Sequence, residues 1–455
     1  MSEAVETIVP LNRSEHGYAA IDGLAATMIQ PYMLRFNATV SEPEMRQALR
    51  RLVSCYPKLR AVLEPGLHRY HLRILPDDEL VDQLFEVAYR VQPGVDIDDQ
   101  SALETYHNQM LNEVMPLERG LSARWRFMPH ATRPVLFFGV HHLLSDGRSI
   151  LLMIADLMKL LNGQGIEAQP VEAPSMVGSI APAHWWQWPV QIMRSRRHKL
   201  DEARRLSTMT VQQVPTRTTA HFTANRMRYH VVPVGTAEMR VAARKLGVSL
   251  NTFVVSALAQ LFLDQAPQDP TAAAVIRVSV DLRRYYPEHC QYGPLLGNHV
   301  GAFLVTEQGV AKSASERVKS VDASIKQGQE RYARREMFWT YLLEEALPWM
   351  GRTLIAHVAG QLKRKNRFPR ISCHATSLGD VSWVNPKDAH LKIVEFIPAV
   401  TSISLLHVLS EMDGKLYVTA SWQRCDTTVA EIDDYLSRLD QVLLRLMQAA
   451  DLTPA

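Results

Sequence analysis

Hydrophobic and polar positions follow two different periods along the chain, and both recur from one end to the other. Residues 41–55 open with a Ser-x-x-Glu capping box and place apolar residues at helical spacing, which predicts a helix. Residues 149–161 predict a strongly apolar helix that ends at an Asn-Gly pair. Short apolar runs at residues 123–128 and 135–140 predict strands. Interleaved helices and strands of this kind are typical of an α/β protein.

The segment from residue 164 to about residue 215 interrupts this pattern. It contains several prolines, a tryptophan-rich cluster at residues 184–189 and a basic stretch at residues 194–199. Prolines and a change of composition are typical of a domain boundary. We therefore expect two α/β halves of similar size, residues 1–180 and residues 181–455, joined by this crossover linker.

The second half carries the same kind of pattern as the first. Its most apolar run, around residues 253–263, is shorter than the roughly 20 residues of a membrane span and is interrupted by polar residues, so a buried helix is expected. Strands are predicted at residues 274–280 and 393–396, and a helix at residues 428–448 closes the pattern.

Composition narrows the class of protein. Of the 455 residues, 47% are hydrophobic and 21% charged, which argues against disorder. Lysine plus arginine number 50 against 47 acidic residues, so the net charge of +3 does not suggest a nucleic-acid partner. The four cysteines form no CxxC pair, which argues against a disulfide scaffold or a structural zinc module. The acidic N-terminus resembles no signal peptide, and we expect a cytoplasmic enzyme.

One segment carries a recognisable chemical pattern. An apolar strand ends in His141-His142, the chain turns at Asp146-Gly147, and an apolar helix follows. Neighbouring side chains of a strand point to opposite faces, so only one of the two histidines is expected to face a given cavity. A neutral imidazole there suits a general base, and an ionised Asp146 would need a cationic partner if buried. The opposite faces argue against a metal site, whereas two structural histidines beside a turn remain an alternative.

The segment from His141 to Gly147 resembles the HHxxxDG signature of the chloramphenicol-acetyltransferase-like acyltransferases. This superfamily includes nonribosomal peptide condensation domains, plant BAHD acyltransferases, polyketide-associated acyltransferases and wax ester synthases. Three further segments are similar to its motifs in the same order: a VDxR strand end at residues 278–287, a GN…F segment at residues 297–303, and an SNLG-like segment at residues 376–381, in which Thr-Ser replaces Ser-Asn.

The resemblance implies two chloramphenicol-acetyltransferase-like α/β domains that face each other across a central tunnel. It implies that His142 is the general base, which removes a proton from a hydroxyl or amine as that group attacks an acyl thioester, without an acyl-enzyme. His141, Asp146 and Gly147 would support the site, with Asp146 paired to Arg283 from the second half. Arg284 is the neighbour that could be confused with Arg283.

Such a reaction also needs a stabiliser for the oxyanion. The candidates are the backbone N–H of Gly147 and the hydroxyls of Thr376 and Ser377, although each is equally a plain turn residue. Asn298 is a further candidate near the tunnel, and it too could be a turn residue because it follows a glycine.

The resemblance implies no bound cofactor and a thioester donor, either acyl-CoA or the phosphopantetheinyl arm of an acyl or peptidyl carrier protein. The acceptor would be a small alcohol or amine. The DFGWG motif of the BAHD subgroup is absent from the sequence, so a plant-type BAHD acyltransferase is not expected. No segment follows the last predicted helix that could form a carrier domain, so we expect a freestanding enzyme, which could still take its donor from a separate carrier protein.

Two basic stretches, residues 194–199 and residues 363–367, bear on partners. Each is read either as a solvated helix face or loop, or as a contact for an acidic carrier protein, for CoA phosphates or for anionic lipid headgroups. The tryptophan cluster beside the first stretch would suit a peripheral membrane contact or a hinge packed between domains.

An acyltransferase in lipid or natural-product biosynthesis is therefore the first functional hypothesis. The alternatives are a freestanding condensation enzyme, which forms an amide between two carrier-bound substrates, and a non-catalytic, condensation-like module that binds a carrier protein. The sequence leaves open the acyl chain, the acceptor, the choice between ester and amide, the choice between CoA and carrier-protein donor, and the oligomeric state.

Overall fold

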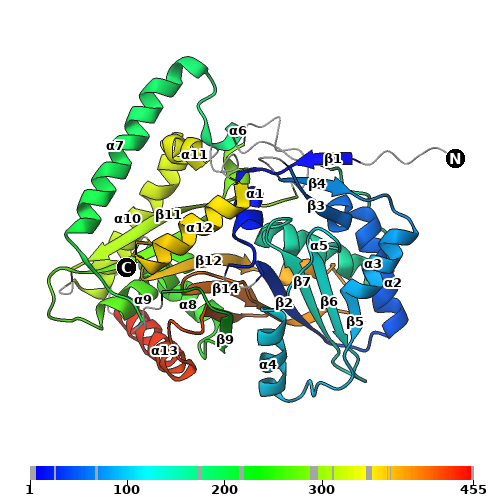
Figure 1. Ribbon diagram of the computed structural model, residues 1–455. Coiled ribbons are helices and arrows are strands. Elements are labelled where there is room, and N and C mark those ends of the chain that lie inside the picture. The colour runs from blue at the N-terminus through cyan, green and yellow to red at the C-terminus, as the bar shows by residue number, and fades with distance from the viewer. Residues whose placement is uncertain are drawn as a thin grey trace.

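The computed structural model describes residues 7–24, 27–66, 70–171, 177–214, 220–286, 296–309, 312–344, 351–365, 367–368 and 370–451. Helices and strands alternate through these ranges (Figure 1), and the strands form three sheets within them. The expected mixed α/β class is confirmed.

The first large sheet holds the strand that leads into the HHxxxDG segment. Its strand order is β13-β2-β7-β6-β5, with bounds Ile393–Pro398 (β13), Ile29–Phe36 (β2), Val135–His141 (β7), Ala123–Met128 (β6) and Tyr89–Val91 (β5). Every residue of β6 and of β7 is buried, because other elements cover both faces of the sheet. Helices α2 (Glu42–Cys55) and α5 (Gly147–Leu161) pack on each other beside it.

The predicted bounds of α2 and the predicted end of α5 are confirmed because local signals set them, while α5 begins at Gly147, two residues before the predicted start. Ser41 caps α2 through the expected capping box with Glu44. At the end of α5, Asn162 is the C-cap residue and Gly163 has a φ of +75°, a left-handed conformation that favours glycine. The other elements of this half are β1 (Thr7–Pro10), β3 (Ala61–Pro65) and β4 (Tyr70–Ile74), which form a small sheet, and the helices α1 (Arg13–Ile21), α3 (Glu79–Ala88) and α4 (Gln100–Met110).

The second large sheet has the strand order β11-β10-β12-β14-β15-β9, and β8 pairs with β10. The bounds are Thr210–Val211 (β8), Asn225–Val231 (β9), Ala272–Asp281 (β10), Val300–Gln308 (β11), Cys373–Asp380 (β12), Leu406–Met412 (β14) and Lys415–Gln423 (β15). One face of this sheet packs against four helices, and together they form the hydrophobic core of the second half, called the second core below. The helices are α8 (Thr236–Lys245), α9 (Leu250–Leu263), α10 (Ala314–Ala333) and α13 (Val429–Asp451). The expected buried helix α9 is confirmed, because most of its side chains lie in this core.

The opposite face of the same sheet is only partly covered. Along β11, buried residues alternate strictly with partly exposed ones, and the same alternation marks the start of β12. On the partly exposed face, His374 of β12 lies beside Arg277 of β10 in the parallel register, and Ser279 Oγ lies 2.9 Å from His374 Nε2. Polar side chains therefore line a face that a hydrophobic core would otherwise occupy.

The remaining elements connect the two halves or border them. They are α6 (Val177–Ile180), α7 (Trp188–Ser207), α11 (Phe338–Glu344) and α12 (Gly351–Arg364), with short 3₁₀ helices at Pro57–Arg60, Trp185–Gln187, Leu282–Tyr285 and Ser382–Val384. Figure 1 shows α7 as a long helix along the outer edge of the molecule, within the predicted linker. Of the helices that the structure describes, none is by itself long and apolar enough to cross a membrane; α8 and α9 reach that length only as a pair bent by 87°.

The halves are more interlocked than the expected division at residue 180 suggests. We assigned the predicted strand at residues 393–396 to the second half, and this was wrong: β13 pairs antiparallel with β2 and completes the first sheet. Side-chain amides also join the halves, since Asn108 of α4 both donates to and accepts from the backbone of Met227 on the edge strand β9. The linker bounds themselves stay a prediction.

Candidate active site

The HHxxxDG segment lies at the predicted strand–turn–helix junction. His141 is the last residue of β7, the next four residues turn, and Asp146 caps α5 by accepting a hydrogen bond from Ser149 N at 2.9 Å. Because β7 runs between β2 and β6, the turn emerges from the middle of the first sheet. The sequence thus places the two histidines at a rigid strand end.

His141 serves the local structure. It is fully buried, its Nδ1 accepts a hydrogen bond from Leu143 N at 3.1 Å, and its Nε2 donates to Asp22 Oδ1 at 3.0 Å. Burial works against ionisation of Asp22, but the interactions with His141 and the hydrogen bonds from Thr27 and Met28 N together outweigh it and lower the pKa of that carboxyl. Both ring nitrogens of His141 are therefore occupied.

His142 has a different environment, as the opposite-face argument predicted. Its Nδ1 lies 2.9 Å from Ser145 O and 2.9 Å from Asn298 Nδ2. A carbonyl oxygen only accepts, so Nδ1 is assigned the proton and donates to Ser145 O. The Asn298 amide nitrogen is itself a donor, so it makes no hydrogen bond with the protonated Nδ1 and donates to His142 O at 2.8 Å. The lone pair is then on Nε2, to which no described residue hydrogen-bonds, and the residue keeps 8% of its surface exposed.

Burial lowers the pKa of His142 to about 4, and the Nδ1 hydrogen bond to Ser145 only partly opposes that effect. The imidazole is therefore neutral at physiological pH, which is the form that can take up a proton. Burial also lowers the pKa of His374 to about 3, and the charge of Arg277 contributes in the same direction. The partly covered face of the second sheet lies beside the motif, because Leu378 of β12 packs against Gly147.

Tyr18 is the residue at this site that the sequence did not suggest. Its ring stacks on the His142 imidazole with centroids 4.0 Å apart and an interplanar angle of 23°. Burial raises the pKa of Tyr18, so the phenol stays protonated. The tyrosine comes from α1, which is capped by Asn12 and lies far from the motif in sequence.

Asn298, expected near the tunnel, lies at the site, and a buried ion pair holds its segment in place. Lys58 Nζ lies 3.0 Å from Glu15 Oε1, and both side chains are almost completely buried. Asn298 N donates to the same Glu15 oxygen at 3.4 Å, and Lys58 donates to Leu296 O at 3.4 Å. Gly297 has a φ of +132°, which favours glycine. The first half therefore positions Asn298, which in turn contacts His142.

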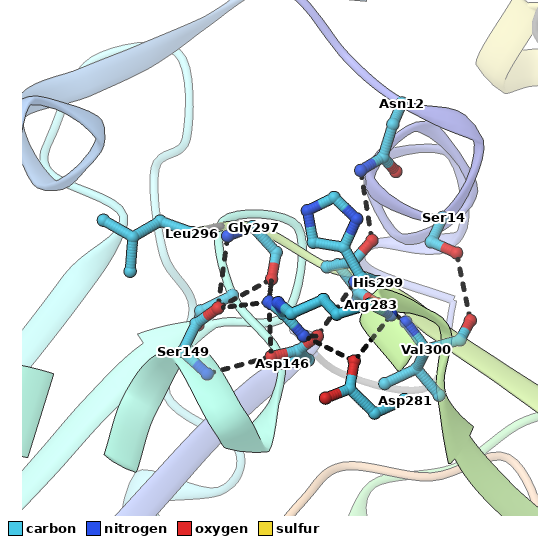
Figure 2. Close-up of polar contacts among 12 residues, drawn as sticks. Asn12, Ser14, Asp146, Ser149, Asp281, Arg283, Leu296, Gly297, His299 and Val300 are labelled. Carbon is cyan, nitrogen blue, oxygen red and sulfur yellow. Dashed lines mark hydrogen bonds and ion pairs between the residues drawn. The ribbon is translucent and has the colours of Figure 1, made fainter. Parts of the chain in front are cut away.

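The predicted pair between Asp146 and Arg283 is present (Figure 2). Arg283 Nη1 donates to Asp146 Oδ2 at 2.8 Å and Nη2 to Asp146 Oδ1 at 3.2 Å, a bidentate geometry. Nη2 also donates to Ser149 Oγ at 2.9 Å and to Gly297 O at 3.2 Å. His299 N adds a further hydrogen bond to Asp146 Oδ2 at 2.9 Å.

This network fixes the charge of Asp146. Burial by itself would raise the pKa of Asp146, but the Arg283 guanidinium more than reverses this and holds it well below the ordinary value. The carboxylate is thus a permanent anion whose lone pairs are taken by Arg283, Ser149 and His299. It joins the two halves of the chain rather than exchanging protons. Arg284, the neighbour in sequence, is exposed.

The three oxyanion candidates lie differently. Leu378 of β12 packs so closely against Gly147 that a Cβ there would lie 2.6 Å from Leu378 Cδ2. On the same face of the sheet, Leu378 packs in a hydrophobic cluster with Leu406 and Val408 of β14. Val408 pairs with Thr376, so Thr376 also lies on this face, which is turned toward the motif.

Ser377 lies on the other side of β12. It pairs with Leu409, whose side chain is in the second core, and its own hydroxyl accepts a hydrogen bond from Gly379 N at 3.3 Å. Ser377 is therefore a strand residue beside a β-bulge, on the opposite side of β12 from Thr376. No described residue accepts a hydrogen bond from the Gly147 N–H, which lies at the N-terminus of α5. Among the described residues, no group of three His, Cys, Asp or Glu side chains is arranged to hold a metal ion.

Comparison with known families identifies the chain. The model of the condensation domain family matches residues 20–271, more than half of the sequence. The chain belongs to the condensation domain family. Among curated individual proteins, none matches it.

Solved condensation domains and their relatives share the fold over almost the whole chain. The first condensation domain of the calcium-dependent antibiotic synthetase superposes with a TM-score of 0.73 and 16% identity, covering 99% of this chain and 98% of that domain. Trichothecene 15-O-acetyltransferase TRI3 from Fusarium sporotrichioides gives 0.70 and 13%, covering 99% and 96%. The epimerization domain from the third module of tyrocidine synthetase B gives 0.62 and 15%, covering 98% of each chain.

The family match confirms the predicted superfamily, and these likenesses confirm its two-lobed chloramphenicol-acetyltransferase-like fold. Sequence identities this low speak for the fold alone. The condensation-domain relatives are named for condensation, acetyl transfer and epimerization, so the fold does not choose among reactions. For this condensation-domain protein, the choice has to come from the chemistry of its own side chains.

Proposed function

We propose that the chain is an acyltransferase that moves an acyl group from an acyl-CoA or carrier-protein thioester to a hydroxyl or amine. The observation that carries the proposal is the 2.9 Å contact of His142 Nδ1 with Ser145 O, which assigns the proton to Nδ1 and leaves the Nε2 lone pair free on a buried, neutral imidazole. A base so placed is unprotonated at neutral pH and can accept a proton from an acceptor group.

The proposed reaction uses one base and forms no acyl-enzyme. His142 Nε2 takes the proton from the acceptor O–H or N–H as that oxygen or nitrogen bonds to the thioester carbonyl carbon. The tetrahedral oxyanion collapses, the C–S bond breaks, and the thiolate leaves with the proton that His142 held. Asp146 takes no part in these transfers because Arg283, Ser149 and His299 saturate its oxygens.

Two groups remain as stabilisers of the oxyanion. The Gly147 N–H points from the positive end of α5, and Thr376 lies on the β12 face turned toward the motif. Removal of an oxyanion donor typically costs about 3–4 kcal/mol of transition-state stabilisation. The phenol of Tyr18, which stays protonated against the His142 ring, offers a further donor beside the base.

The test is a search for the product. The purified chain is incubated with a mixture of acyl-CoAs and a metabolite extract, and in parallel with an acylated carrier protein, and the mixtures are analysed by mass spectrometry. We expect acylated products that form with the wild-type chain and not with His142→Ala. A broad panel in which neither donor format yields a product above that of the variant would contradict the proposal and favour the non-catalytic binding module.

A second function is favoured by the family itself. The condensation domain match and the likeness to a synthetase condensation domain favour amide formation between two carrier-bound substrates. The same experiment separates the two functions. Product from a free small-molecule acceptor supports the acyltransferase, whereas product only when both donor and acceptor are loaded on carrier proteins supports condensation.

The pH dependence follows from the lowered pKa of His142. Protonation removes the Nε2 lone pair, so activity is lost as pH falls through the folded-state pKa of about 4. We expect kcat/KM to stay level across the neutral range and to decline only near that value. The profile is measured together with circular dichroism, so that acid unfolding is not mistaken for titration. A decline centred near 6.5, the ordinary value for histidine, would show that the base is better solvated than the structure indicates.

A further inference from the structure

Helix α7 packs on the rest of the molecule along one side only. Ser195 is its buried residue, and the Ser195 hydroxyl accepts a hydrogen bond from Trp339 N at 3.2 Å. At the start of the helix, Trp188 makes an edge-to-face contact with Phe338 of α11 at 5.1 Å. In Figure 1 the helix follows the outer edge of the molecule, away from the sheets. The other side of α7 therefore has no partner within the described chain.

That outer side carries a regular stripe of side chains. We call it the α7 stripe: Trp186, Val190, Met193, Arg197, Leu200 and Arg204. The intervals of four and three residues place the five members within α7 on one face of that helix, and Trp186, in the 3₁₀ helix Trp185–Gln187 just before it, continues the spacing. The apolar members are exposed, from 48% for Leu200 to 69% for Met193, and the neighbouring Trp185 is 75% exposed. The Trp188 side chain packs against Phe338, whereas the side chains of Trp185 and Trp186 are exposed to solvent.

Basic side chains flank the stripe on both sides. Exposed cations along α7 outnumber its two acidic residues, Asp201 and Glu202; they are Arg194, Arg196, Arg197, Lys199, Arg204 and Arg205. The ion pairs among them are long, from 3.4 to 3.9 Å, and Arg197 and Arg204 remain 86% and 79% exposed. The second basic stretch differs, because Lys363 is held by Asp426 at 3.3 Å and is mostly buried.

Charge decides which partner fits the α7 stripe. Intervals of four and three also suit helix pairing between two copies of the chain. Pairing would, however, bring together two helices with arginines on the contacting face and on both flanks, and like charges at close range repel. An apolar stripe between basic flanks, with tryptophans at one end, instead matches a helix that lies in the surface of an anionic bilayer.

We propose that α7 is a membrane-surface helix whose stripe enters the interface of an anionic lipid bilayer. The 20 residues of α7 span about 30 Å along the surface. Trp185, Trp186 and Met193 lie at headgroup depth or just below it, and the flanking arginines contact lipid phosphates. The contact is independent of the proposed acyl transfer, since α7 contributes no side chain to the site around His142.

The test uses the full chain and vesicles of phosphatidylcholine, with and without phosphatidylglycerol, in a sedimentation assay. We expect the wild-type chain to sediment with the mixed vesicles only, and less so at high salt. Replacing Trp186, Met193 and Leu200 together with serine is expected to lower the apparent affinity about tenfold or more, with loss of any blue shift in tryptophan emission. Replacing Arg197 and Arg204 with glutamine should weaken binding and flatten its salt dependence.

Matched controls come from exposed residues elsewhere. Val114, which is 77% exposed, is replaced with serine, and the exposed Arg51 and Arg119 with glutamine; these variants should bind as the wild type does. Binding that survives in the stripe variants, or that is equal on neutral vesicles, overturns the proposal. Failure of the wild-type chain to bind mixed vesicles also overturns it, and binding of an acidic carrier protein through the same residues would then assign the stripe to a protein partner.

Discussion

Replacing His142 with alanine is expected to lower kcat/KM for acyl transfer by about 10²–10⁴-fold, the usual contribution of a positioned general base. The side chain supplies the free Nε2 lone pair, and Asp146 cannot replace it because its oxygens are bound by Arg283, Ser149 and His299. The measurement is steady-state kinetics with a substrate pair from the product search. Full activity in the variant would contradict the assignment of His142 as base.

Two further variants separate loss of the base from loss of structure. His142→Gln offers an amide that can still donate to Ser145 O but has no basic nitrogen, so we expect it to be as inactive as the alanine variant and closer to wild type in melting temperature. Asn298→Ala removes the hydrogen bond to His142 O and keeps the imidazole, so a smaller loss is expected. His130→Ala, on a partly exposed loop residue outside the site, should leave the rate unchanged.

Features set by neighbouring residues were readable from the sequence. The capping box at Ser41, the Asn-Gly end of α5 and the strand–turn–helix course of the motif each depend on a few consecutive side chains, and the structure confirms all three. The Asp146–Arg283 pair is not local, yet it was predicted, because a buried carboxylate requires a cation and the resemblance identified which arginine supplies it.

Features set by distant pairing were not readable. The sheet to which β13 belongs is decided by its pairing with β2, more than 350 residues away along the chain. The pattern of apolar and polar residues within β13 would be the same in either sheet, so it does not reveal the partner strand. Glu15 and Lys58 are charged residues, which sequence patterns place on the surface, and only the fold brings them together in the interior. Tyr18 reaches His142 for the same reason.

The largest effect on stability is expected at Arg283. Replacing it with alanine leaves the Asp146 carboxylate buried without its counterion, and loss of one partner of a buried ion pair typically costs about 3–5 kcal/mol. The variant also loses the hydrogen bonds from Arg283 to Ser149 Oγ and Gly297 O, so the segment that carries Asn298 is held less firmly against the first half. We expect a lower midpoint of urea denaturation, followed by circular dichroism and by tryptophan fluorescence, with reduced kcat/KM at temperatures where the variant is folded.

The neighbouring arginine provides the matched control. Arg284→Ala removes the same charge one residue away at an exposed position, so its effect on the free energy of unfolding should stay within about 0.5 kcal/mol. Because the pKa of Asp146 lies well below its ordinary value, the pair remains ionised throughout the neutral range and the difference between the two variants should not depend on pH there.

A double-mutant cycle tests whether the cost arises from the pair itself. Asp146→Asn removes the buried charge that Arg283→Ala would leave unpaired, so the double variant should be less destabilised than the sum of the two single variants. Additive effects would show that Arg283 acts through its other contacts, and an Arg283→Ala variant as stable and active as the wild type would show that the pair does not hold the two halves together. Coupling that appears with the Arg283 cycle and not with one built on Arg284 would locate the joint between the halves at this carboxylate.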